Sequence, residues 1–309
     1  MLRAATWLAL LSVLSACGGG SRPAVGGVDP ATPASGCNGS CADTATSLTV
    51  SDVEGVIARA VAEAQARNVN ATIAVVDRVG NVLAVFRMNG AATDATVRSP
   101  GTAIDGGLEG VDIVPDTTVA IAKAITGAYL STEGNAFSSR TASQIVQDHF
   151  NPQDPLQPGG PLFGVQFSQL PCSDLLDRYS GAVAVGPQRS PLGLSADPGG
   201  FPLYKSGTPV GGVGVVSDAL YSFDRNISDI DSDDDELIAV AAMSSLAAPA
   251  ERRANVIAVD GRSLRFADGG EAQLQSDPAA APSFASIDNI AGVLVAVPGY
   301  VTASISAGA

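Results

Sequence analysis

Apolar and polar positions follow two different periods in the first part of the chain, and these periods predict a helix followed by a β-hairpin. Ser51 and Glu54 form a Ser-x-x-Glu capping box, and apolar residues then recur at helical spacing to about Arg67. Residues 71–76 form an apolar β-type run, and residues 82–88 alternate in the manner of a second strand. Turn residues separate the two runs, so we expect an antiparallel hairpin.

Three helices and three strands are predicted between residues 116 and 246. We expect Asp116 to cap a helix that runs to about Tyr129, and Ser138 to cap another that ends at Asn151-Pro152. The acidic stretch 229–236 leads into a last helix over residues 237–246, because carboxylates in a first turn complement the helix dipole. Apolar runs predict strands at residues 181–185, 201–204 and 210–216.

The element order is therefore roughly α-β-β-α-α-β-β-β-α, which predicts an α+β fold with a mostly antiparallel sheet and helices packed on it. We expect one domain over residues 48–247, interrupted by long inserts at 89–115 and 152–180. Residues 248–309 are a C-terminal extension with a hairpin around Asp260-Gly261 and a final apolar strand over 291–297. This β extension is expected to extend the sheet or to cover its edge.

The N-terminus has the pattern of a secreted lipoprotein. Arg3 precedes the short apolar run 7–11, and small residues follow, as in a signal peptide over residues 1–16. Leu14-Ser15-Ala16-Cys17 resembles a bacterial lipobox, in which Cys17 becomes the acylated first residue of the mature chain. Residues 17–47 are rich in Gly, Pro and Ser and read as a flexible tether. We expect an exported protein, held on the membrane only by its lipid anchor.

Gly18 follows the acylated cysteine, which resembles the sorting signals of Gram-negative lipoproteins destined for the outer membrane. Three cysteines remain besides Cys17 in an oxidising compartment. Cys37 and Cys41 lie in a Gly/Ser-rich segment that can close a short disulfide loop, although either cysteine can instead reach Cys172. We interpret these cysteines as structural, because the spacing lacks the second pair or nearby histidine of a zinc site.

Composition narrows the classes of function. Lys and Arg number 17 against 31 Asp and Glu, and the resulting net charge of −14 repels nucleic acid. His149 is the only histidine, so metal sites with several imidazoles are excluded and a Ser-His-Asp or Cys-His arrangement has a single candidate base. No conventional hydrolytic motif accompanies it. The sequence leaves open whether the protein is an enzyme.

Four motifs carry a family resemblance. Residues 74–87, the triplet Ala122-Lys123-Ala124, residues 199–204 and the strand 210–215 resemble, in this order, signatures of the GlcG/HbpS-type haem-binding family. The resemblance spans residues 48 to 246 and implies a profilin-like or PAS-like sandwich that often forms homo-oligomers. Some members bind haem or release iron from it, and others have no settled activity. Haem-binding members share no fixed iron ligand, so none is transferred to this chain.

We consider four residues as candidates for haem contact. His149 can ligate iron through a ring nitrogen, or cap the end of its helix. Tyr129 can offer a phenolate oxygen, or pack in the core. Lys123 and Arg140 lie on successive helices and can bind propionates, or form ion pairs with acidic residues.

Two further motifs have competing interpretations. Asp229, Asp231, Asp233 and Asp235 begin like a calcium loop and could form a Ca²⁺ site, but Asp234 stands where an EF-hand requires glycine. The alternative is a solvated helix start. The glycines of the 210–216 strand permit close approach of a helix or of a flat ligand. We favour helix packing, because the full dinucleotide motif is missing; these glycines are Gly211, Gly212 and Gly214.

We therefore expect a lipoprotein whose domain binds haem or a related small ligand. One alternative is an oligomeric interaction module without a cofactor. The other, suggested only by the resemblance, is an enzyme acting on a small hydroxy-acid or carbonyl metabolite.

Overall fold

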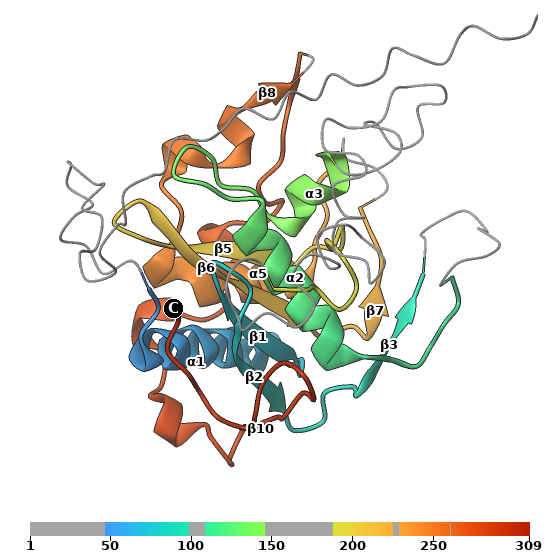
Figure 1. The fold of residues 1–309 in the computed structure, drawn as a ribbon, viewed down its shortest axis with the longest axis vertical. Coiled ribbons are helices and arrows are strands. Elements are labelled where there is room, and N and C mark those ends of the chain that lie inside the picture. Colours follow the sequence, from blue (N-terminus) through green and yellow to red (C-terminus); the bar gives the residue numbers. More distant parts are fainter. Residues whose placement is uncertain (1–46, 99–108, 146–187, 225–228, 260) are drawn as a thin grey trace, which may run out of the picture. The chain divides into compact units, whose positions relative to one another are not determined.

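An antiparallel sheet of five strands, in the order β10-β2-β1-β6-β5, forms the centre of the domain in a computed structural model of the chain (Figure 1). The structure describes residues 47–98, 109–145, 188–224, 229–259 and 261–309. These residues lie in one unit, Asp43–Ala309. The strands are β1 (Thr72–Asp77), β2 (Val82–Met88), β5 (Gly200–Lys205), β6 (Thr208–Val216) and β10 (Gly292–Leu294).

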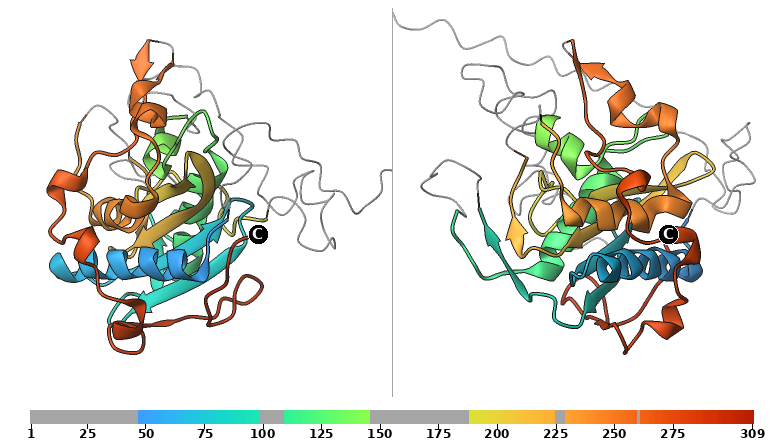
Figure 2. Two further views of the ribbon diagram at one scale, coloured as in Figure 1. Left: turned by 90° about the vertical axis from the view of Figure 1, so that its left-hand side faces the viewer. Right: turned by 180° about the vertical axis from the view of Figure 1, so that it is seen from behind.

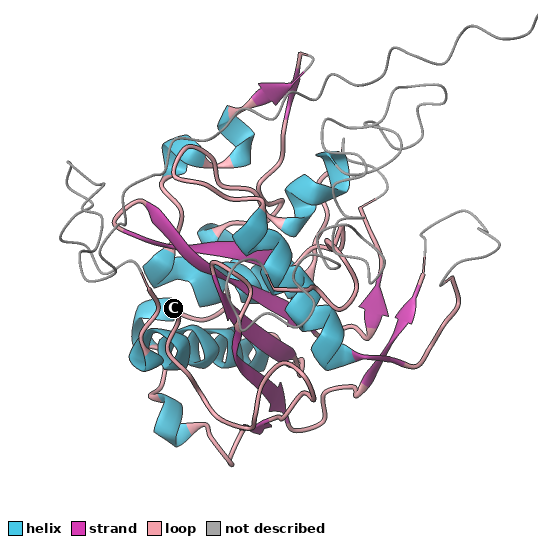
Figure 3. Cartoon of the chain, viewed as in Figure 1, coloured by secondary structure: helices cyan, strands magenta, loops and turns pink. Residues whose placement is uncertain are grey.

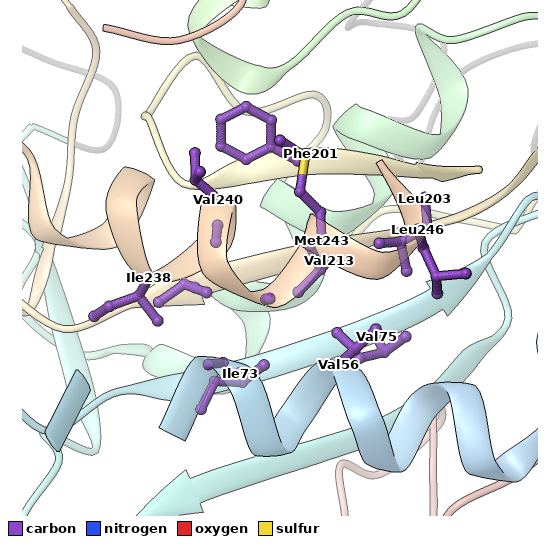
Figure 4. Close-up of a cluster of buried hydrophobic side chains, with 14 of the residues drawn as sticks. Val56, Ile73, Val75, Phe201, Leu203, Val213, Ile238, Val240, Met243 and Leu246 are labelled. Atoms are coloured by element: carbon purple, nitrogen blue, oxygen red, sulfur yellow. The ribbon is translucent and has the colours of Figure 1, made fainter. Parts of the chain in front are cut away.

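Helices cover both faces of this sheet (Figure 2). Successive side chains of a strand point to opposite faces, and Ile73 and Val75 accordingly pack with α1 (Val50–Ala66) and α5 (Asp234–Met243). Figure 4 shows this apolar layer, where Val56 of α1 and Ile238 of α5 meet strand residues. The alternate residues of β1 pack instead with α2 (Asp116–Tyr129) on the other face. The predicted α+β class is confirmed.

The close packing of α2 on the sheet depends on glycine. A Cβ atom on Gly212 or Gly214 would lie 2.1 Å from a backbone oxygen of α2, and one on Gly200 would lie 2.3 Å from another. No side chain fits in this space, so the helix rests directly on the backbones of β5 and β6. This confirms the helix-packing interpretation for Gly212 and Gly214, whereas a Cβ atom on Gly211 would meet Val76 of β1 and Leu48 instead.

Two predicted helix caps are wrong. The capping box of α1 is formed by Thr49 and Asp52, two residues before the predicted pair, because the helix begins at Val50. Asp116 is the first residue of α2, whose N-cap is Pro115, although the Asp116 carboxylate does accept the backbone amide of Thr117 at 2.7 Å. The same carboxylate accepts hydrogen bonds from Arg87 and Thr72, which tie the start of α2 to β2 and β1.

The shorter helix α3 (Ser139–Ile145) has its predicted cap, since the backbone amide of Thr141 donates to Ser138 Oγ at 3.1 Å. The expected end at residues 151–152 and the strand at 181–185 lie outside the described residues. Part of the 89–115 insert forms short strands, β3 (Asp94–Val97) and β4 (Val114–Pro115), and β3 also pairs with β7 (Leu220–Tyr221). Among the described residues, none of the helices is both long and apolar enough to cross a membrane.

The C-terminal extension is mostly loop and single-turn helix (Figure 3). The predicted hairpin is present as β8 (Ala258–Val259) and β9 (Arg262–Ser263). The predicted final strand is β10, which is shorter than expected and pairs antiparallel with β2. The extension therefore does extend the sheet. Its 3-10 turns are η3 (Ala250–Arg252), η4 (Ala254–Val256), η5 (Glu271–Gln273), η6 (Pro278–Ala280) and η7 (Phe284–Ser286), after η2 (Ser244–Leu246) at the end of α5.

Candidate functional site

The ammonium of Lys123 lies inside the protein between two carboxylates. Its Nζ atom is 2.8 Å from Asp197 Oδ2 and 2.7 Å from Asp235 Oδ2, and its side chain has no exposed surface. Lys123 comes from α2, Asp197 precedes β5, and Asp235 lies in the first turn of α5. One side chain thus joins the helices on the two faces of the sheet. The glycines beneath α2 bring Lys123 close enough to reach both carboxylates.

Neighbouring polar groups complete this Lys123 cluster. Asp235 Oδ1 accepts hydrogen bonds from the backbone amide and hydroxyl of Ser217, at 2.7 and 2.6 Å, and Asp197 Oδ1 accepts one from Ser222 Oγ at 3.1 Å. Each carboxylate therefore has partners besides the lysine. Such complete bonding is what keeps a buried ion pair from being costly.

The charges of the cluster shift the pKa values of its members. Burial alone would lower the pKa of Lys123, but the negative charges of Asp197 and Asp235 outweigh this effect and raise that pKa. Burial raises the pKa of Asp235 to about 6, against the opposing charge of Lys123, and Asp218 adds to the rise. Burial also raises the pKa of Asp197. Acidic groups outnumber the single cation, so the cluster has an excess of negative charge.

Arg140 is the centre of a second buried cluster. Its Nη1 atom lies 2.9 Å from Asp224 Oδ2 and 3.0 Å from Asp268 Oδ2, with Asp231 Oδ2 at 3.4 Å. Its Nε donates to Glu236 Oε2. Burial raises the pKa of Glu236, although the charge of Arg140 acts in the opposite direction. Within the described residues, two buried side-chain atoms of this cluster make no hydrogen bond, Arg140 Nη2 and Asp268 Oδ1, and the second of them forms an ion pair with Arg265.

Tyr129 is engaged through its hydroxyl. The Oη atom lies 2.8 Å from the carbonyl oxygen of Val79 and 2.6 Å from that of Gln188. Both carbonyls are acceptors, so the hydroxyl is held as a donor between the β1–β2 turn and the segment before β5. Burial also raises the pKa of Tyr129, which disfavours a phenolate.

The four aspartates considered for Ca²⁺ do not form one set. Asp233 is the N-cap of α5 and accepts a backbone amide at 2.9 Å, while Asp235 belongs to the Lys123 cluster. Asp229 and Asp231 approach Asp224 instead, and one oxygen of each lies within 4.8 Å of the others. Asp224 and Asp231 already contact the Arg140 guanidinium. The group Asp224, Asp229 and Asp231, which Arg140 already contacts, differs from the four-aspartate Ca²⁺ site that the sequence predicted.

The remaining predicted site residues lie outside the described residues. These are the candidate iron ligand His149, the lipidation site Cys17 and the cysteines Cys37 and Cys41. The sequence analysis considered Asp231 and Asp235 as Ca²⁺ ligands but did not assign any carboxylate to either buried cation. The local signal for three of these carboxylates was the dense acidic run 229–236, which supplies Asp231 and, from the first turn of α5, Asp235 and Glu236.

Comparisons with known proteins give one family. Residues 48–100, which contain α1, β1 and β2, match the family model described as "Haem degrading protein HbpS-like". This match confirms the resemblance over residues 48–100, which contain the first of the four motifs. No curated protein matches the chain.

Several solved structures are similar to this chain. A PduOC–haem complex is 20% identical, with 63% of this chain and 91% of that chain covered and a TM-score of 0.34. Klebsiella pneumoniae protein ORFY of family DUF336 is 18% identical, with coverages of 65% and 90% and a TM-score of 0.35. A double mutant of Streptomyces reticuli HbpS is 19% identical, with coverages of 71% and 99% and a TM-score of 0.31.

The described candidate residues do not fit a haem as they stand. Propionates need cations with free hydrogen-bond donors, but Lys123 is enclosed by two carboxylates and Arg140 by four. The Tyr129 hydroxyl is bonded to backbone carbonyls. The ion pairs and core packing that the sequence left open as alternatives are what the structure contains at these three positions.

Proposed function

We propose that this protein is an exported, lipid-anchored protein whose HbpS-like domain binds haem. The observation that carries the haem proposal is the match of residues 48–100 to a family of haem-degrading proteins. The sequence motifs that extend from residue 122 to 215 support it. Export and anchoring rest on a separate observation, the lipobox-like Leu14-Ser15-Ala16-Cys17.

His149 is the axial ligand that we propose. An imidazole nitrogen is a common ligand of haem iron, and this is the single histidine of the chain. Lys123, Arg140 and Tyr129 are engaged by internal contacts, so we assign them to the support of the fold.

Titration with hemin tests the haem proposal directly. The chain carrying Cys17→Ser, which avoids lipidation, is titrated with hemin at micromolar concentration while the Soret band is recorded. We expect a saturable shift. The matched pair of variants is His149→Ala and Tyr129→Phe. The first should move the Soret band and weaken binding, whereas the second should leave the spectrum unchanged because the Tyr129 hydroxyl already bonds to Val79 and Gln188. Absence of any Soret shift would reject haem binding.

A second candidate function is an interaction module without a cofactor. One observation favours it: the buried cations, which a haem site would use, are balanced internally by carboxylates. Protein purified from haem-sufficient cells separates the two candidates. Haem binding predicts a coloured protein that contains iron, whereas the interaction module predicts a colourless protein of defined oligomeric mass by light scattering.

A further inference from the structure

The C-terminal residues 289–309, here called the strap, follow the outer edge of β2 (Figure 1). β10 pairs with residues 86–88, and the Asn89 amide donates to the carbonyl oxygen of Ala291 at 2.9 Å. Further along, the amides of Val295 and Ser306 donate to the carbonyl oxygens of Val85 and Leu83, at 2.8 and 2.9 Å. The strap thus occupies the β2 edge from one end of the strand to the other.

The pairing requires a close approach of the two backbones. A Cβ atom on Gly292 would lie 2.3 Å from the carbonyl oxygen of Arg87 and 2.7 Å from Met88 Cα. These are backbone atoms of β2, so they cannot rotate away as a side chain would. Any larger residue at position 292 must push β10 away from the sheet.

The strap has little regular structure but is held by apolar packing as well as by backbone bonds: Val297 is buried in the layer that contains α2, and Leu294 and Ile305 pack against the opposite layer. Before it, Glu63 of α1 is buried and accepts hydrogen bonds from the amide and hydroxyl of Ser276, at 2.8 and 2.5 Å. At the other end, the Gly308 amide donates to the Leu48 carbonyl oxygen at 2.8 Å. Between these points its regular structure is the three-residue β10. Such a segment opens at a lower free energy than the core of the sheet.

Without the strap, β2 would be an apolar edge strand. Its sequence is Val-Leu-Ala-Val-Phe-Arg-Met, and its one charged residue, Arg87, is already paired with Asp116. Uncovered edges of this kind pair with other strands, and natural proteins protect them with charges, bulges or covering segments. Here protection comes from the covering segment.

We propose that the strap is an intramolecular cap that keeps two copies of this chain from pairing through β2, and that its release creates a self-association surface. The partner is a second copy, because two identical apolar edges can pair antiparallel about a two-fold axis. The main-chain bonds that β2 gives to the strap would then be made to the β2 strand of the other copy.

Two variants release the strap by different means. Gly292→Val introduces the backbone clash, and Val295→Pro removes the amide that donates to Val85. The matched control is Gly270→Val, at an extended position with φ −137°, where an added Cβ meets only a side-chain oxygen at 3.6 Å. Light scattering after size exclusion gives the mass over a range of concentrations. Hydrogen exchange at Ser306 reports strap release in both variants, and exchange at Val295 reports it in Gly292→Val, with the amides of β1 as the measure of folding.

We expect the released variants to reach twice the mass of the control as concentration rises, with fast exchange at Ser306 and protected β1 amides. The proposal is overturned if the strap exchanges freely in a folded variant whose mass equals that of the control at every concentration. It is equally overturned if Ser306 stays protected in both variants, because the strap would then not be a displaceable cap.

Discussion

Replacing Lys123 by methionine removes one buried ammonium while it keeps most of the length and apolar volume of the side chain. In the wild-type protein the Nζ atom lies 2.8 Å from Asp197 and 2.7 Å from Asp235, and the two carboxylates are at most 8% exposed. The Lys123→Met variant therefore leaves two carboxylates in the interior without their counter-ion.

The expected loss follows from the hydrogen bonds that remain. Breaking a buried ion pair by removing one partner typically costs about 3–5 kcal/mol. Asp235 keeps two bonds from Ser217, and Asp197 keeps one from Ser222, so we place the loss near the lower end, at about 3 kcal/mol. A domain with a total stability of about 5–15 kcal/mol remains folded after such a loss.

The loss should depend on pH with a definite sign. Burial raises the pKa values of Asp235 and Asp197, and the charge of Lys123 limits that rise. Without the lysine both pKa values rise further above their unfolded values. The folded state then binds more protons than the unfolded state, so the free energy of unfolding increases as pH falls from neutral through the folded pKa. The deficit of Lys123→Met relative to wild type should shrink between pH 7.5 and pH 5.

Urea denaturation followed by circular dichroism at these two pH values measures the deficit. The matched control is Lys205→Met, which removes a lysine paired with Asp52 at 2.5 Å near the surface. We expect a loss of less than about 1 kcal/mol for that partly exposed pair. A Lys123→Met loss no larger than the control, or a deficit that is equal at pH 7.5 and pH 5, would refute the assignment of a stabilising buried ion pair.

Three further predictions test other parts of the structure. Gly214→Ala places a Cβ 2.1 Å from the backbone oxygen of Ala120 and should lower the free energy of unfolding by about 1–3 kcal/mol. Gly134→Ala, whose added Cβ would meet only the Thr132 hydroxyl at 3.6 Å, should change it little, and equal effects would contradict the close packing of α2. Hydrogen bonds lower the pKa of the Glu63 carboxyl in spite of its burial. The stability that the Glu63 carboxylate contributes is therefore present above the unfolded-state pKa of about 4.3 and is lost as pH falls from there through the lower folded-state pKa. Thermal melts should show a smaller loss of melting temperature in acid for Glu63→Gln than for wild type. Cys17→Ser should move the protein from the membrane fraction to the soluble fraction, and unchanged membrane association would disprove the lipobox interpretation.

Much of the fold could be predicted because local patterns determine local structure. The hairpin of β1 and β2 follows from alternation around a turn, and α1 and α5 follow from helical spacing and first-turn acids. The role of the strand glycines was also readable, since a strand without side chains has few other uses. Caps were less predictable: Ser51 and Glu54 match the Ser/Thr-x-x-Glu/Gln capping-box pattern, but the helix begins at Val50 and the box is formed by Thr49 and Asp52.

The candidate site was predictable only in its residue types. Lys123 and Arg140 stood out as cations on successive helices, but their partners come from distant parts of the chain, with Asp235 lying 112 residues beyond Lys123. Helical and strand periods extend over fewer than about 20 residues, so they cannot predict a contact between residues this far apart in the sequence. Lys123 and Asp235 meet because α2 and α5 lie on opposite faces of one sheet and both contact β5 and β6.

The sequence by itself therefore determined the elements, the apolar faces that they bury and the chemistry available for a site. Tertiary structure decided which groups meet. In the folded chain Lys123 and Arg140 are surrounded by carboxylates, Asp116 pairs with Arg87, and the strap lies along β2. The physical reason is that period and propensity act over a few residues, whereas ion pairs and edge pairing are set by the path of the chain between them.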